Sequence, residues 1–69
     1  MAQPRINDRV VYQAHGSPNG QHKSLPRAAI VTQVNDDHTV GLCIVNPTGL
    51  FFATSVAQGQ GPGEWRWEE

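Results

Sequence analysis

The chain has 69 residues, enough for a single domain, and five Lys and Arg against six Asp and Glu give it a formal charge of −1. This balance argues against a protein that grips duplex DNA, because binding to the phosphate backbone requires an excess of cations on one face. The sequence also lacks the polybasic or amphipathic helical segment that a membrane-surface protein uses.

The single cysteine, Cys43, excludes a disulfide within the chain and fits a reducing compartment. No apolar run approaches the roughly 18–20 residues that span a bilayer, and the N-terminal residues contain no apolar stretch typical of a signal peptide. We therefore expect a soluble protein of the cytoplasm.

Strand patterns dominate the chain, whereas apolar residues never recur at helical spacing. Five segments rich in β-branched and aromatic residues are predicted as strands: 9–13, 27–34, 39–45, 50 to about 56, and 64–67. The strongest local signal is Asn46-Pro47-Thr48-Gly49, whose residue types suit a type I turn. Two longer connections remain, a polar loop over 14–26 and a Gly/Gln loop over 57–63.

Short strands joined by tight turns, with one long early loop, predict an all-β domain covering residues 1–69. A small five-stranded barrel of the SH3 type fits this pattern best. A β-sandwich fragment or an open meander would produce much the same sequence.

Three of the predicted strands are apolar on both faces, at 28–31, 42–45 and 50–53. A lone small barrel is expected to alternate apolar and polar residues. We therefore predict a homo-oligomer that covers the second face, with Phe51, Phe52, Val45 and Val31 at the contact. The alternative is that the long loop folds back over this face.

The loop over 14–26 is the first candidate ligand site, because a polar loop of this length in so small a domain is often functional. Its glycines allow backbone N–H groups to turn toward an anion, and its cations add charge. The candidate residues are His15, Gly16, Ser17, Asn19, Gly20, Lys23 and, at the start of the next strand, Arg27. A surface loop without a ligand is an equally good interpretation.

Trp65 and Trp67 flank Arg66, so on a strand both indoles share one face and Arg66 takes the other. Such a pair suits stacking against a base or another flat ligand, with Arg66 as a further candidate cation. The alternative is that one or both tryptophans plug the core, and we favour this role for one of them.

Metal binding and catalysis find little support in the sequence. His15, His22, His38 and Cys43 lack the paired spacing of structural zinc sites, so we predict no metal and no cofactor. Ser17 lies near His15 but has no nucleophile elbow and no orienting acid, so we predict no catalytic residues and no enzyme.

Four segments together resemble a group of short, mostly uncharacterised proteins of bacteriophages and prophages. They are His15-Gly16-Ser17-Pro18-Asn19-Gly20, Arg27-Ala28-Ala29-Ile30-Val31, Val40 to Phe52 with its Asn-Pro-Thr-Gly-Leu-Phe-Phe stretch, and Pro62-Gly63-Glu64-Trp65-Arg66-Trp67. The resemblance implies a viral protein that works in the host cytoplasm, and it brings no catalytic residues. Glu68 follows the last Trp where members of the group often have Pro.

Three functions are compatible with these observations. The first is a phage-type binding protein that sequesters a small, anionic, nucleotide-like host defence signal. The second is a protein-interaction module that inhibits a host protein or serves as a virion adaptor, using open strand edges and exposed aromatics. The third is a single-stranded nucleic-acid binder, which the near-neutral charge disfavours.

Overall fold

The computed structural model describes residues 3–16 and 24–68. Across these residues, five strands form one antiparallel sheet: β1 (Arg9–Gln13), β2 (Pro26–Val34), β3 (Val40–Asn46), β4 (Gly49–Val56) and β5 (Trp65–Trp67). All five strands predicted from the sequence are therefore confirmed, each within one residue at either end. No helix long and apolar enough to cross a membrane is found in the described part of the chain.

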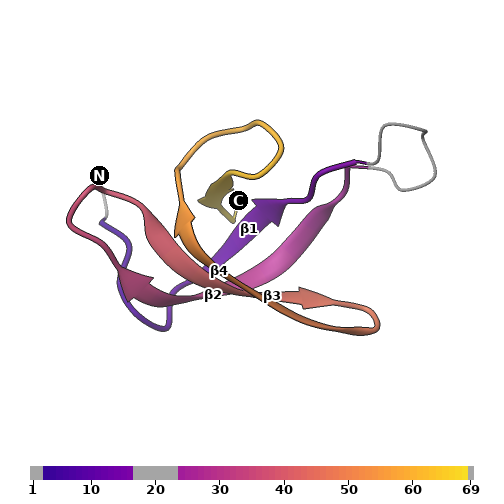
Figure 1. The fold of residues 1–69 in the computed structure, drawn as a ribbon, viewed down its shortest axis with the longest axis horizontal. Helices are drawn as coiled ribbons and strands as arrows, with labels where there is room; N and C mark the ends of the chain where they lie inside the picture. Colours follow the sequence, from indigo (N-terminus) through magenta and orange to yellow (C-terminus); the bar gives the residue numbers. More distant parts are fainter. Residues whose placement is uncertain (1–2, 17–23, 69) are drawn as a thin grey trace.

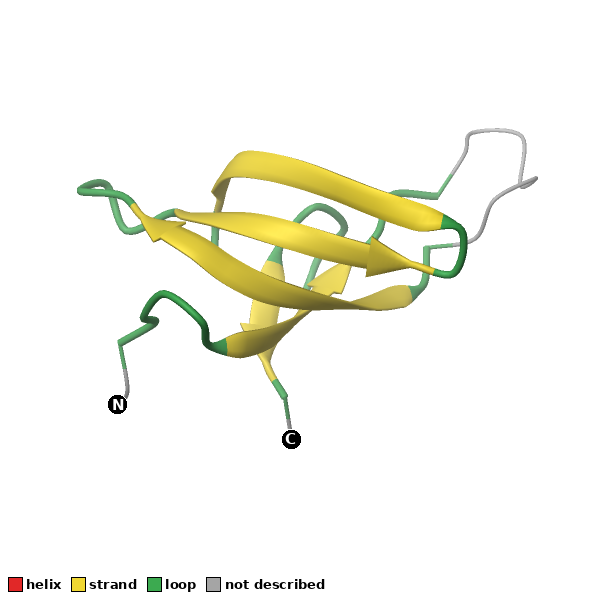
Figure 2. Ribbon diagram, turned by 90° about the horizontal axis from the view of Figure 1, so that it is seen from below, coloured by secondary structure: helices red, strands yellow, loops and turns green. Residues whose placement is uncertain are grey.

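The strand order is β4-β3-β2-β1-β5, so β4 and β5 are the two edges of the sheet. The sheet coils strongly (Figures 1 and 2), and the segment after β4, orange to yellow in Figure 1, curves back over it to reach β5. Only an isolated bridge between Gln58 and Trp65 connects this returning segment to β5. The all-β class is confirmed, but the sheet is not closed, and the SH3-like barrel is not confirmed.

The turn at Asn46-Pro47-Thr48-Gly49 joins β3 to β4 as the sequence predicts. Asn46 pairs with Gly49, which leaves Pro47 and Thr48 as a two-residue loop. Neither loop residue has a positive φ, as a type I turn requires. Proline at the first loop position presets the backbone for this turn.

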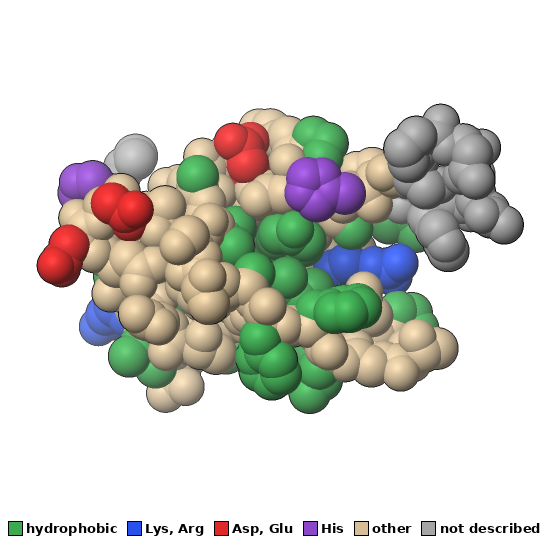
Figure 3. Space-filling model, viewed as in Figure 1, with side chains coloured by type: hydrophobic (Ala, Val, Ile, Leu, Met, Phe, Trp, Pro, Cys, Tyr) green, Lys and Arg blue, Asp and Glu red, His purple; other side chains and the backbone are tan. Residues whose placement is uncertain are grey.

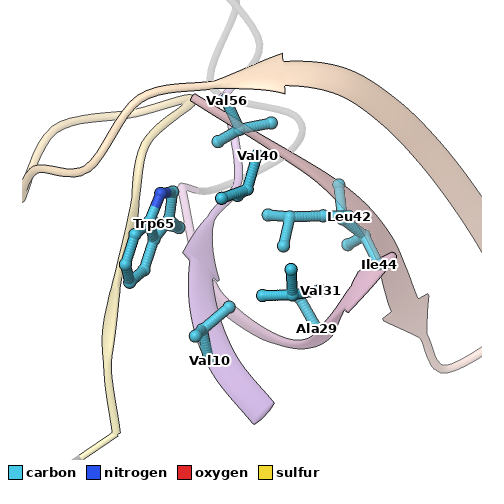
Figure 4. Packing of buried hydrophobic residues seen from close by; sticks show 8 residues of the cluster. All are labelled: Val10, Ala29, Val31, Val40, Leu42, Ile44, Val56 and Trp65. Carbon is cyan, nitrogen blue, oxygen red and sulfur yellow. The ribbon is translucent and has the colours of Figure 1, made fainter. Parts of the chain in front are cut away.

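The core lies on the concave face of the coiled sheet. It consists of eight buried hydrophobic residues: Val10, Ala29, Val31, Val40, Leu42, Ile44, Val56 and Trp65. Figure 4 shows the aliphatic side chains pointing into the space that the strands enclose, with the Trp65 indole at one side. Every strand contributes to this cluster, so the curl of the sheet depends on its burial.

The opposite, convex face of β2, β3 and β4 is also apolar. The pairs Ile30–Cys43 and Cys43–Phe52 run across it, as do Val45–Leu50 and Ala28–Val45. Ile30, Val45, Leu50 and Phe52 are all exposed. The prediction that these strands carry apolar residues on both faces is therefore confirmed, and the described residues leave this second face uncovered.

Candidate functional site

A groove of about 540 Å³ opens on the concave face beside the core. We call it the inner groove; its lining residues are Tyr12, Ala14, His15, Arg27, Ile44, Asn46, Thr48, Phe51, Phe52 and Ala53. Its volume lies within the range of roughly 300–1,000 Å³ that is typical of small-molecule sites. In Figure 3 the molecule is hollowed at this level, with hydrophobic side chains around a Lys/Arg side chain and a histidine.

Two side-chain donors in the groove have no hydrogen-bond partner among the residues that the structure describes. They are the Nε atom of Arg27 and the Nδ2 atom of Asn46, and both atoms are buried. Arg27 on β2 and Asn46 on β3 each lie one residue beyond the Ala28–Val45 pair, whose side chains are on the convex face. Because side chains alternate along a strand, Arg27 and Asn46 both lie on the concave face. An unpartnered buried donor costs about 1–3 kcal/mol, so a turn of either side chain that brings its donor to an acceptor of a ligand in the groove would be favourable.

The groove is locally positive although the chain carries a formal charge of −1. Arg27 and His15 are the basic residues in its lining, and no Asp or Glu lines it. The one salt bridge among the described residues joins Arg9 to Glu68, away from the groove. Arg27 therefore has no carboxylate partner in the described part of the chain, and an incoming anion meets an unneutralised guanidinium.

Aromatic rings form the walls of the groove. Tyr12 is half-buried on β1, and Phe51 on the edge strand β4 is 66% exposed. Phe52 also borders the groove, but its ring lies on the convex face. Exposed rings beside a cation suit a flat, partly apolar ligand, because stacking on an aromatic face is favourable for any planar ring. The arrangement can therefore bind a molecule with a ring at one end and an anionic group at the other.

His15 connects the groove to the long loop predicted as a ligand site. Its imidazole lies against Gly63, since a Cβ placed on that glycine would be 2.5 Å from the Nε2 atom of His15. His15 and Gly16 are exposed, and the structure brings His15, but not Gly16, into the groove lining. The other candidates of this loop, Ser17, Asn19, Gly20 and Lys23, lie outside the described residues.

The tryptophan pair does not form the predicted platform. Trp65 is 1% exposed and belongs to the core, so the role as a plug that we favoured for one tryptophan is confirmed. Trp67 is half-buried, and its ring meets that of Trp65 edge to face, with centroids 5.2 Å apart and planes at 89°. The two indoles are not coplanar, and neither lines the inner groove.

Arg66 faces away from the two tryptophans, as its position between them predicts. Its guanidinium donates to Oε1 of Gln13 at 3.1 Å, and it does not line the inner groove. Of the two arginines predicted as ligand contacts, only Arg27 therefore lies in the groove. The sequence predicts a turn position for Asn46 and not a site role. Strand alternation from Ile44 is the signal that places Asn46 on the same face as Ile44.

The residues predicted at a contact between copies divide into two groups. Phe51, Phe52 and Val45 are exposed, as such a contact requires. Val31 is fully buried in the core, so its assignment to the contact is wrong. The reason is the pleat of β2, which turns Val31 to the concave face and its neighbour Ile30 to the convex face.

Among the described side chains, no three His, Cys, Asp or Glu residues lie together as metal ligands would. Comparison with known proteins adds no assignment to this geometry. No protein-family model matches the chain, and neither the curated proteins nor the solved structures gave a match.

Proposed function

We propose that this chain is a non-enzymatic binding protein whose inner groove holds a small, anionic, nucleotide-like ligand. The observation that carries the proposal is Arg27, an arginine without a carboxylate partner among the described residues, in a groove lined by aromatic side chains and by no acidic residue. Arg27 and Asn46 would donate to the oxygens of a phosphate or carboxylate. Tyr12 and Phe51 would contact the base.

The resemblance to bacteriophage proteins supplies the biological setting of this proposal. A protein of this kind would act in the host cytoplasm, where it would sequester a nucleotide signal of the host's defence. Sequestration requires binding alone, so this function needs no catalytic residues. A coiled five-stranded sheet of this size also remains compatible with an SH3-like barrel that self-associates.

The proposal is tested by mixing the purified protein with a panel of cyclic and ADP-ribose-type nucleotides and recording thermal shifts. Any ligand that raises the melting temperature is then titrated by calorimetry. No shift with any member of the panel would contradict the proposal, since a ligand that binds only the folded state must stabilise it.

A pair of variants tests the site itself. R27Q removes the charge inside the groove, and R66Q makes the same change at a half-buried arginine that is bonded to Gln13 and does not line the groove. Loss of a charge-assisted hydrogen bond costs about 1.5–3 kcal/mol, which corresponds to a fall in affinity of roughly 10- to 150-fold for R27Q. R66Q should bind as the wild type does; equal losses in both variants would move the site away from the inner groove.

A second candidate function is a protein-interaction module, and the exposed convex face favours it. Ile30, Val45, Leu50 and Phe52 form an apolar surface of the kind that marks protein contacts. This function predicts that one host protein co-purifies with the chain and that no nucleotide changes its melting temperature.

A further inference from the structure

Over Gly49–Ala53, the edge strand β4 lacks the charges, prolines and bulges that normally protect a sheet edge, and its one register shift against β3 lies beyond Ala53. Its eight residues, Gly49–Val56, include no charged residue and no proline. Natural edge strands are usually protected by charges, prolines, bulges or a covering loop, because their free N–H and C=O groups can pair with another strand. No other strand of the described residues lies beside the outer edge of β4.

The free stretch of this edge runs from Gly49 to Ala53, which pair in regular register with Asn46 to Leu42 of β3. Near the end of β4, the carbonyl oxygen of Thr54 accepts a hydrogen bond from Nδ2 of Asn35 at 2.8 Å. The stretch from Gly49 to Ala53 has no such partner on its outer side among the described residues. It is also the most apolar part of the strand.

The side chains of this stretch are exposed on both faces of the sheet. Leu50 and Phe52 lie on the convex face, and Phe51 lies on the concave face, where it lines the inner groove. With about 150–250 Å² of surface for each aromatic side chain, the exposed parts of Phe51 and Phe52 amount to roughly 300 Å². A partner packed on the convex face would cover Phe52 but leave Phe51 exposed.

A strand paired along the edge covers both faces at once. Its side chains lie about 4.5–5.5 Å from those of β4 on each side of the sheet, within reach of aromatic rings. Edge pairing therefore accounts for exposed phenylalanines on both faces at the same point of β4.

We propose that the strand occupying this edge is β4 of a second copy, paired antiparallel about a two-fold axis near Phe51, the centre of the free stretch. Such an axis places each residue opposite the same or a nearby residue of the other copy. Since β4 carries no charge, this arrangement brings no like charges together. Two sheets of five strands then become one continuous sheet through the dimer.

The dimer would also complete the inner groove, a consequence that rests on the proposed function. Phe51 and Ala53 line the groove from β4, at the edge where it is open to the second copy. The concave side of the second β4 would extend this wall with its own Phe51. A ligand in the groove would then contact residues of both copies.

Analytical ultracentrifugation of the wild type across the micromolar range tests the dimer, with F52K as the decisive variant. Phe52 is 73% exposed, so the substitution leaves the core unchanged, but it places two positive charges beside the two-fold axis. We expect a dimeric wild type and a monomeric F52K. Q60K adds the same charge at an exposed loop residue and should remain dimeric. Circular dichroism melting checks that each variant is folded.

A third variant tests whether the two copies meet through the β4 edge or through the convex face. I30K places a charge on the convex face of β2, two strands away from the edge, and should remain dimeric. Hydrogen exchange of the amides in Gly49–Ala53 should slow with increasing protein concentration, because edge pairing protects backbone N–H groups. A monomeric wild type at high micromolar concentration, or a dimer broken by I30K and not by F52K, would overturn the proposal. A dimer that binds no nucleotide would overturn the proposed function alone.

Discussion

Truncation of Leu42 gives the sharpest test of how the sheet is stabilised. Leu42 is fully buried on β3, the strand between β2 and β4, and belongs to the core cluster on the concave face. L42A removes three carbon atoms from the interior. At about 0.8 kcal/mol for each buried carbon, the lost burial alone amounts to roughly 2.4 kcal/mol.

The cavity left behind adds to this loss, so the total should reach about 3–4 kcal/mol. A domain of this size has a net stability of only about 3–5 kcal/mol. L42A should therefore lie close to its unfolding midpoint at room temperature. A loss of about 3 kcal/mol corresponds to a fall in melting temperature of roughly 12–24 °C, at about 4–8 °C for each kcal/mol.

The matched control is I6A, which removes the same number of carbon atoms from a residue that is 59% exposed and lies outside the strands. Only about two-fifths of its side chain is buried, so the loss should stay near or below about 1 kcal/mol. Urea denaturation followed by circular dichroism measures both variants. Equal losses for L42A and I6A would refute the argument that the concave cluster stabilises the fold.

Two further predictions concern single contacts. The hydroxyl of Thr39 donates to Asp37 at 2.6 Å and thereby lowers the pKa of that carboxyl group from its ordinary value of 3.8. The carboxylate therefore stabilises the fold above pH 3.8, and this contribution is lost as the pH falls through the lowered pKa. The difference in free energy of unfolding between wild type and D37N should shrink in acid. A constant difference down to pH 2 would contradict this prediction. Gly63 has a φ of 81° and lies against His15, so an alanine at this position is strained. Urea denaturation of G63A should show a free energy of unfolding about 1–2 kcal/mol lower than that of the wild type. An unchanged midpoint would show that the loop relaxes to accept the alanine.

The amino-acid sequence by itself determined the strands. β-branched runs separated by turn residues are local signals, and each of the five predicted segments is a strand in the structure. The turn at Pro47-Thr48 was equally predictable, because proline presets the backbone at that position. The apolar character of both faces of β2, β3 and β4 could also be read from the sequence.

Tertiary structure alone decided which of these residues are core and which are site. Trp65 and Trp67 have the same local pattern, yet only the position of β5 beside β1 buries Trp65 in the core. Arg27, Asn46 and Phe51 come from three different strands, and no local rule brings them together. Their convergence depends on strand order and on the coiling of the sheet, which arise from contacts between residues far apart in the chain.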